Sequence, residues 1–317
     1  MSSKQLGEFQ LIQQISQQFS PAPGTTGIGD DCAVIPQQTG LDSLVSTDML
    51  IEGTHFLLEH ADPYRLGWKS AAVNLSDIAA MGGKAVASFL SFALPGDLPA
   101  GWVSQFISGY KDISELFQCP LMGGDTTRSL DRLCISVTVL GESKSGQAKL
   151  RSSAEEGDLI CTSGFIGDSA AGLDCILSHA ADTPLTETLI RRHYLPMPRI
   201  KEGLALAQIE GVHAMMDISD GIGSDLRHIL KASQKGAVID CRKLPISEET
   251  RQYCSLSGKD PLEFALSGGE DYELLFTISP DAEKDLTINH FVIGEIVRGE
   301  GVSWQGTDKD YLGFRHF

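Results

Sequence analysis

Several features that mark common protein classes are missing from this chain. Its seven cysteines are scattered without a C-x-x-C pair, which argues against a zinc site and favours reduced thiols in a reducing compartment. No run approaches the roughly 20 apolar residues of a membrane helix, and the N-terminus has no apolar segment typical of a signal peptide. We therefore expect a soluble, cytoplasmic protein with no membrane partner.

Positive charge is also scarce. The chain has 25 Lys and Arg against 42 Asp and Glu, a formal charge of −17, so we expect no nucleic-acid partner, because phosphate backbones are bound by an excess of basic residues. The G-x-x-x-x-G-K-[ST] loop and the H-R-D and D-F-G motifs of protein kinases are absent too. Any phosphate chemistry must therefore use another arrangement.

What the chain has instead is glycine beside aspartate: 33 of its 317 residues are glycine, against a typical usage of roughly 7%. Apolar runs lead through small residues to an aspartate near positions 31, 48, 125 and 217–220. Asp77 differs because it falls within a predicted helix, on the same face as Asn74.

A single aspartate at a strand end is more often a turn or cap residue than a ligand. Several of them in apolar runs, with few Lys or Arg nearby, favour the alternative of a carboxylate cluster on metal ions, because an unpaired buried charge is costly. Oxygen-only ligands suit Mg²⁺, which also binds phosphates.

The loop over 163–169, Ser-Gly-Phe-Ile-Gly-Asp-Ser, admits two interpretations. Its glycines allow backbone N–H groups to approach a phosphate closely. Equally, it is a plain turn from a strand into a helix, capped by Asp168 or Ser169.

Strands and helices alternate in both halves, which predicts an α/β or α+β fold with mixed sheets. A polar, glycine-containing stretch near 143–149 predicts a boundary between an N-terminal domain, 1–148, and a C-terminal domain, 149–317. The hydrophobic patterns predict helices over 9–19, 63–81, 102–117, from 170 onward, 200–209 and 222–233. They predict strands over 32–35, 44–48, 86–94, 120–124, 135–139, 158–162, 215–217, 272–278 and 292–297.

Eight segments resemble the bacterial thiamine-monophosphate kinase family, in that family's order: 27–33, 46–48, 55–56, 74–77, 79–82, 123–128, 219–221 and 267–274. The resemblance implies a two-domain, aminoimidazole-ribonucleotide-synthetase-like architecture whose N-terminal domain dimerises through its sheet. It also implies that ATP passes its γ-phosphate to thiamine monophosphate, giving thiamine diphosphate and ADP, with several Mg²⁺ ions.

Carried over position by position, the resemblance implies three groups of site residues. The metal ligands would be Asp31, Ser46, Thr47, Asp48, Asp77, Asp125, Asp217 and Asp220, with Asp30 an alternative to Asp31. The nucleotide would contact Tyr110, Gly124, Asp125, Arg151 and Ser219. The acceptor would contact His55, Glu270 and Phe314. The residues alone favour a structural role for His55 and a solvated surface charge for Arg151, and they offer a turn carboxylate at Glu270 and a core aromatic at Phe314 as alternatives.

The implied acceptor is a phosphate monoester with a second pKa of about 6, and hence largely dianionic at neutral pH. It needs no strong base, so we expect no catalytic base and no phosphoenzyme. The obstacle is repulsion: two unit charges about 4 Å apart cost roughly 4 kcal/mol at an effective dielectric near 20. Metal ions bridging both phosphates would offset that cost.

Several rival functions fit the same scaffold. An aminoimidazole ribonucleotide synthetase stays an alternative, although it lacks the match over 267–274, and the hydrogenase-maturation relative would end in a reactive cysteine. A selenophosphate synthetase would carry a reactive cysteine before the first aspartate motif, whereas no cysteine precedes Cys32. A non-catalytic protein that binds Mg-ATP without turning it over is a rival from another class, which only an assay separates.

Overall fold

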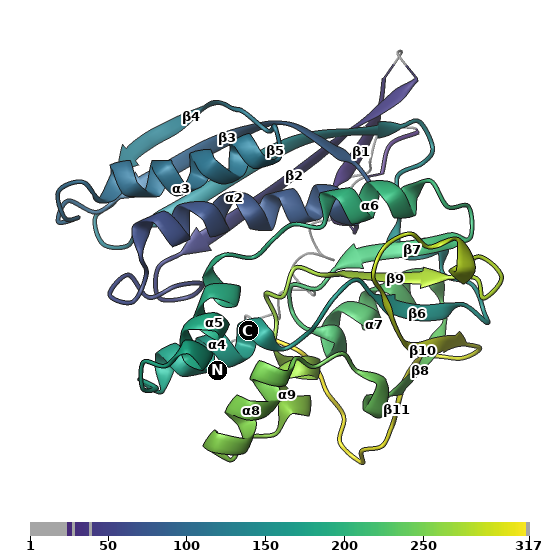
Figure 1. Ribbon diagram of the computed structural model, residues 1–317. Helices are drawn as coiled ribbons and strands as arrows, with labels where there is room; N and C mark the ends of the chain where they lie inside the picture. The colour runs from purple at the N-terminus through teal and green to yellow at the C-terminus, as the bar shows by residue number, and fades with distance from the viewer. Residues whose placement is uncertain (1–23, 27–28, 38–39, 315–317) are drawn as a thin grey trace, which may run out of the picture.

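The computed structural model describes residues 24–26, 29–37 and 40–314. The helix predicted over 9–19 lies outside the described residues. Figure 1 shows two halves, each made of a sheet with helices packed against it. The two halves meet along the long helix Pro63–Ala80.

The N-terminal half holds a five-stranded sheet with the order β1-β2-β5-β3-β4. Its strands are β1 (Ala33–Pro36), β2 (Leu41–Ile51), β3 (Lys84–Leu94), β4 (Leu121–Arg128) and β5 (Cys134–Lys144). The helices α2 (Pro63–Ala80) and α3 (Trp102–Leu116) cover one face of this sheet (Figure 1). Residues of β5 alternate strictly between buried and partly exposed, as a strand with one covered face requires.

Local chemistry fixes where helix α2 begins and ends. The Asp62 side chain accepts a hydrogen bond from the Arg65 backbone N–H, and Pro63 occupies the first turn, where its missing N–H costs nothing. The helix stops before Gly82, whose positive φ of 67° suits glycine. The helix predicted over 63–81 is therefore confirmed.

The C-terminal half holds a six-stranded mixed sheet with the order β11-β8-β10-β6-β9-β7. Its strands are β6 (Leu159–Thr162), β7 (Val212–Asp217), β8 (Gly236–Asp240), β9 (Leu274–Ile278), β10 (Phe291–Val297) and β11 (Gly301–Gln305). Its helices are α4 (Asp168–Leu177), α5 (Pro184–Tyr194), α6 (Ile200–Ala207), α7 (Ile222–Ser233), α8 (Glu248–Ser257) and α9 (Pro261–Ser267). Short 3₁₀ turns lie at Arg151–Ser153, Cys241–Lys243 and Glu283–Asp285.

Helix α2 packs against both halves. A Cβ added to Gly203 of α6 would lie 2.2 Å from the Ala79 carbonyl oxygen, so α6 approaches α2 more closely than any larger residue allows. One hydrophobic core joins Leu75 and Ile78 of α2 to Met215 of β7 and Phe276 of β9. The side chains of α2 are therefore held rigidly between the two sheets.

Most predicted elements are confirmed within a few residues, but some are wrong in extent. Strands β2 and β4 are longer than predicted, and helix α4 begins at Asp168 rather than at 170. The sequence patterns predict no element where α5, α8, α9, β8 and β11 lie, because these segments are short or largely polar. No helix in the described part of the chain is long and apolar enough to cross a membrane.

Candidate functional site

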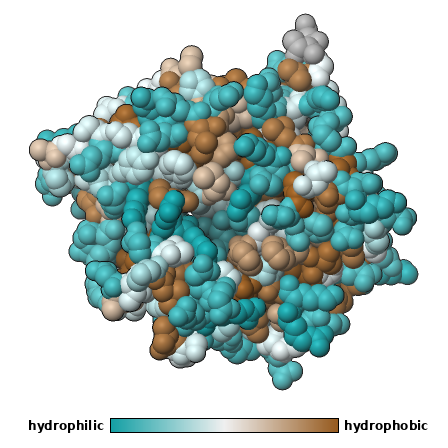
Figure 2. All heavy atoms as spheres, viewed as in Figure 1, coloured by the Kyte–Doolittle hydropathy of each residue, from teal (hydrophilic) through white to brown (hydrophobic). Residues whose placement is uncertain are grey.

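A cavity of about 700 Å³ lies where α2 meets the second half of the chain. The strand β2, the helices α2 and α4, the turn after β7 and the segment before β9 all contribute to its wall. Figure 2 shows a hollow between the two halves, surrounded on this face largely by hydrophilic residues. Eight predicted site residues line the cavity: Asp48, His55, Asp77, Asp217, Ser219, Asp220, Glu270 and Phe314.

Three carboxylates converge at one end of this region. Asp31, Asp77 and Asp217 each offer an oxygen, and these oxygens lie within 4.8 Å of one another. The three residues come from the segment before β1, from α2 and from the end of β7, so only the tertiary fold unites them. Asp217 is 3% exposed. We call this group, with the neighbouring Asp48, the carboxylate cluster.

Burial and mutual repulsion disfavour the charged forms in the cluster. Burial, and then the charge of Asp31, raise the pKa of Asp217 to about 8. The same two causes raise the pKa of Asp48 to about 6. Burial, followed by the charges of Asp48 and Asp217, holds the pKa of Asp77 well above its usual range. Such a group favours a bound cation, because burying unpaired carboxylates is costly.

Arg151 compensates part of this charge. Its Nη2 donates to Asp31 Oδ1 at 2.7 Å, and its Nε donates to Asp31 Oδ2 at 3.2 Å. Its backbone N–H lies 3.3 Å from Asp30 Oδ2. The Arg151 side chain is therefore ion-paired, and the interpretation of Arg151 as a solvated surface charge is wrong. Asp31 faces the cluster while Asp30 faces the Arg151 backbone, which favours Asp31 as the ligand.

Hydroxyl and backbone contacts fix the orientation of the other acids. Ser46 Oγ donates to Asp77, and Ser76 Oγ donates to Asp217 Oδ2 at 2.6 Å. Asp225, 1% exposed, accepts from the backbone N–H groups of Ser219 and Asp220, both at 3.1 Å. Sequence reasoning missed Ser76 and Asp225, although Ser76 lies in a segment it had singled out.

The donor set fits magnesium. The ligand atoms that converge are carboxylate and hydroxyl oxygens from Asp31, Asp77, Asp217 and Ser46. Mg²⁺ prefers such oxygens and keeps part of its shell for water and phosphate.

The remaining lining of the cavity is less acidic and more apolar. His55 Nδ1 accepts from the Ile51 N–H at 3.0 Å, so the proton of the neutral ring lies on Nε2. Glu270 Oε1 lies 2.8 Å from Lys69 Nζ. Phe314, half-exposed, is held by its N–H donating to the Asp220 carbonyl at 2.9 Å. Apolar walls are supplied by Leu173, Leu177 and Phe264.

Two predicted metal ligands do not reach the cluster. Thr47 lies on the opposite face of β2 from Asp48, because neighbouring strand residues alternate, and its hydroxyl donates to the Val137 carbonyl at 3.1 Å. Asp125 pairs across the sheet with the exposed Ser91, which places it on that same outer face. Three strand spacings, about 14 Å, separate β4 from β2. Within one chain, neither side chain contributes to the cluster.

Two predicted nucleotide contacts also lie elsewhere. Tyr110 is 1% exposed in the core, and its hydroxyl donates to Ser88 Oγ at 2.9 Å. Gly124 lies on the edge strand β4, where an added Cβ would be 1.7 Å from the Leu90 carbonyl oxygen. Close strand pairing thus explains this glycine without a nucleotide. The structure gives neither residue a place in the cavity.

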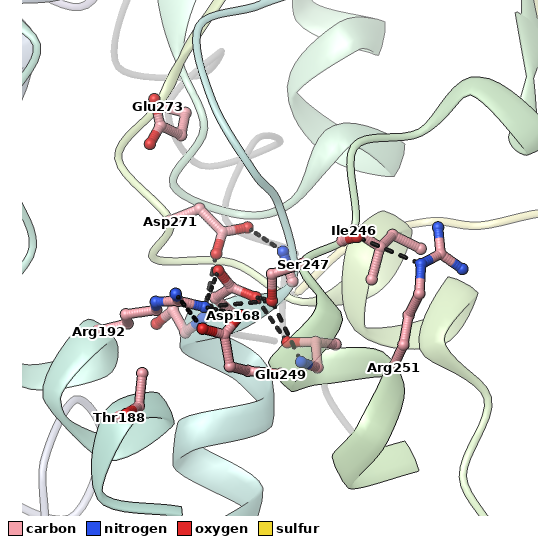
Figure 3. A network of polar contacts seen from close by, with 12 residues as sticks. Asp168, Thr188, Arg192, Ile246, Ser247, Glu249, Arg251, Asp271 and Glu273 are labelled. Carbon is pink, nitrogen blue, oxygen red and sulfur yellow. Dashed lines mark hydrogen bonds and ion pairs between the residues drawn. The ribbon is translucent and has the colours of Figure 1, made fainter. Parts of the chain in front are cut away.

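The phosphate interpretation of the 163–169 loop is wrong. Figure 3 shows Asp271 reaching back to this loop. Its Oδ2 accepts from the Gly167 N–H at 2.7 Å and its Oδ1 from the Ser169 N–H at 3.2 Å. These donors are the ones a phosphate would need. The segment is a strand-to-helix turn, but its cap is Asp271, neither Asp168 nor Ser169.

Comparison with known proteins finds relatives along the whole chain. The family model of the AIR synthase related protein N-terminal domain matches residues 29–143, and that of the C-terminal domain matches 155–305. The thiamine-monophosphate kinase of Aquifex aeolicus is 37% identical over 100% of both chains. That of Escherichia coli K12 is 38% identical over 98% of both. A solved structure of AaThiL complexed with AMPPCP and TMP matches with a TM-score of 0.91 and 37% identity, covering 100% of this chain and 99% of that one.

Proposed function

The chain belongs to the thiamine-monophosphate kinase family of AIR synthase related proteins, and we propose that it transfers the γ-phosphate of ATP to thiamine monophosphate. The predicted family and the mixed α/β fold of two such domains are confirmed. The enzyme class, an ATP-dependent kinase, agrees with the names of the relatives and with the AMPPCP and TMP of the AaThiL complex.

The observation that carries the proposal is the combination of charged and apolar side chains that line one cavity. Carboxylates from three separate segments meet within 4.8 Å, and the cavity beside them is lined by His55, Glu270 and apolar side chains. This lining fits an acceptor whose phosphate lies near the carboxylates and His55 and whose heteroaromatic head lies near Glu270 and the apolar side chains.

Asp31, Asp77 and Asp217 would hold magnesium, with Asp48, Asp220 and Ser46 beside them. When bound, magnesium supplies positive charge that offsets repulsion between the two anionic substrates. The residues of the chain would orient the reactants, with Arg151 and Ser219, beside the cluster, contacting the nucleotide. We propose direct in-line transfer, because the acceptor dianion needs no base and no residue need be phosphorylated.

His55 has a defined part in this arrangement. Because its Nδ1 accepts from the Ile51 N–H, its Nε2 is a hydrogen-bond donor. We propose that this donor contacts the acceptor phosphate and aligns it, without moving a proton.

We also propose that the chain forms a homodimer through the outer face of the first sheet. That face exposes large apolar side chains: Met49, Val86 and Phe89. Exposed apolar patches of this kind mark association surfaces. Thr47 and Asp125 lie on the same face, so the roles predicted for them depend on this interface.

The test is incubation with ATP, Mg²⁺ and thiamine monophosphate, followed by oxidation to fluorescent thiochrome diphosphate. We expect stoichiometric ADP and thiamine diphosphate. If the protein binds nucleotide but forms no thiamine diphosphate, the proposal fails in favour of a nucleotide-binding protein without turnover.

A further inference from the structure

Buried polar side chains lie behind Glu270, and of these only Ser169, as a cap residue, was singled out from the sequence. Lys69 of α2 is 1% exposed, Ser169 of α4 is 2% exposed and His193 of α5 is 3% exposed. A fully buried lysine is rare unless it is paired. We call these three residues the Lys69 relay.

Lys69 meets acceptors on two sides. Its Nζ lies 2.8 Å from Glu270 Oε1 and 3.3 Å from His193 Nε2, and it stands 5.9 Å from the centre of the Tyr194 ring. The aromatic face adds a weaker attraction for the cation. The ammonium group can only donate, so His193 Nε2 must accept.

This contact decides the tautomer of His193. With Nε2 accepting, the proton of the neutral ring lies on Nδ1, which is 3.0 Å from Ser169 Oγ and 3.6 Å from Glu270 Oε2. Burial, and then the Lys69 charge, lower the pKa of His193 to about 3, so the ring is neutral at physiological pH. Lys69 therefore supplies the positive charge that faces Glu270.

The backbone of Glu270 is equally constrained. Its φ is +62°, a left-handed conformation that non-glycine residues rarely adopt and that persists only when the surroundings enforce it. Its N–H donates to the Ser219 carbonyl at 2.7 Å. Both the main chain and the carboxylate of Glu270 are thus held in one orientation at the cavity wall.

Helix α2 links this orientation to the carboxylate cluster. Lys69, Val73 and Asp77 are spaced by four residues and so share one face of the helix. Val73 and Asp77 line the cavity. Eight residues at 1.5 Å each separate Lys69 from Asp77 by about 12 Å. One rigid helix therefore sets the distance between the two ends of the site.

We propose that the Lys69 relay consists of positioning residues, which hold the Glu270 carboxylate ionised and aimed to accept a hydrogen bond from the exocyclic amine of the acceptor's aminopyrimidine. This inference rests on the proposed function. The amine is the acceptor's strong N–H donor, since its hydroxyl is esterified. Because the charge of Lys69 already offsets that of Glu270, the carboxylate then binds a hydrogen-bond donor in preference to a cation.

The test compares two acceptors: thiamine monophosphate and oxythiamine monophosphate, in which an oxo group replaces the amine. For the unmodified protein we expect kcat/KM to favour the amine by about 10⁴-fold, as for sites built to bond a polar group. In Lys69→Met we expect that ratio to fall at least tenfold, through KM for thiamine monophosphate, with KM for ATP unchanged. A purely structural role would lower kcat/KM for both acceptors alike.

Ser169→Ala removes one hydroxyl and keeps the proposal testable if Lys69→Met does not fold. We expect it to reduce the ratio by about two- to fivefold. Lys149→Met is the matched control, because the Lys149 ammonium is also partly buried but donates to the Ile209 and Val212 carbonyls. It should leave the ratio unchanged.

The outcomes separate the two claims. If the unmodified protein does not phosphorylate thiamine monophosphate, the proposed function fails first. If it does, but the ratio stays unchanged in Ser169→Ala and in any folded Lys69→Met protein, the relay is structural and this inference is overturned.

Discussion

Two groups of buried aspartates in this protein look alike in sequence and differ in their partners. Asp168 is 7% exposed and accepts from Thr250 Oγ1 at 2.6 Å, from Arg192 Nη1 at 2.8 Å and from Ser247 Oγ (Figure 3). In the carboxylate cluster, Asp77 and Asp217 each receive one serine hydroxyl and face other carboxylates.

Burial alone therefore does not mark a functional site. Burial also raises the pKa of Asp271, although that residue caps a helix through two backbone N–H groups. The two groups differ in how their negative charge is compensated. Hydroxyl, backbone and guanidinium donors surround Asp168 and Asp271, whereas the carboxylates of the cluster lie next to one another. Only the second arrangement calls for a metal ion.

The largest expected effect comes from the cluster. Asp217→Asn should lower kcat by about 10³-fold, the upper range for removing a group that stabilises transition-state charge. The free energy of unfolding should not fall, because the amide brings no charge into the cluster. Thiochrome assays and urea unfolding measure both quantities. A kcat within about threefold of the unmodified protein at saturating Mg²⁺ would refute the role of Asp217.

A smaller effect is expected at the acceptor end. His55→Ala should raise KM for thiamine monophosphate by about tenfold, the value of one hydrogen bond to a charged group, while KM for ATP stays the same. His290→Ala serves as the control, since His290 bonds to Glu283 and Ile288 within the second half. An effect confined to ATP would reassign His55 to the nucleotide.

Around Asp168, whose charge is compensated by several donors, we expect a substitution to lower stability and not activity, the opposite of the result expected at the cluster. Ser247 caps helix α8 by accepting from the Thr250 N–H at 3.1 Å and also donates to Asp168. Ser247→Ala should cost about 1 to 2 kcal/mol of stability and leave kcat unchanged. Ser108→Ala, in an exposed stretch of α3, should change stability by less than about 0.5 kcal/mol. Equal losses in the two variants would remove the contrast.

The smallest effect concerns pH in the metal-free protein. The pKa of Asp217 is raised from 3.8 to about 8, so the folded state holds a proton that the unfolded chain releases. That contribution to stability is present at low pH and is lost as pH rises toward 8. Added Mg²⁺ should therefore raise Tm more at pH 8 than at pH 6, by on the order of 2–4 °C. An equal shift at both pH values would contradict this.

Much of the fold could be predicted from the sequence, because long periodic segments carry strong signals. The alternation of β5 and the cap and apolar face of α2 sufficed for both elements. Helices α8 and α9 were missed because they are only 10 and 7 residues long, which leaves little periodicity to detect.

The site was predictable in kind but not in geometry. Spacing could not show that Thr47 and Asp48 project from opposite faces of β2. Nor could it show that Asp125 belongs to an edge strand. Lys69 was missed for a related reason: a lysine in a helix normally faces water, and its partner Glu270 lies 201 positions further along the chain. Such pairs exist only after the two halves pack.

The most direct test of the carboxylate cluster is a count of bound divalent ions. Mn²⁺ can stand in for Mg²⁺ in electron paramagnetic resonance titrations with AMPPCP present, comparing the unmodified protein with Asp77→Asn. We predict that the unmodified protein binds more Mn²⁺ per chain than the nucleotide alone holds, and that Asp77→Asn loses this excess. Identical binding curves for the two proteins would contradict the account.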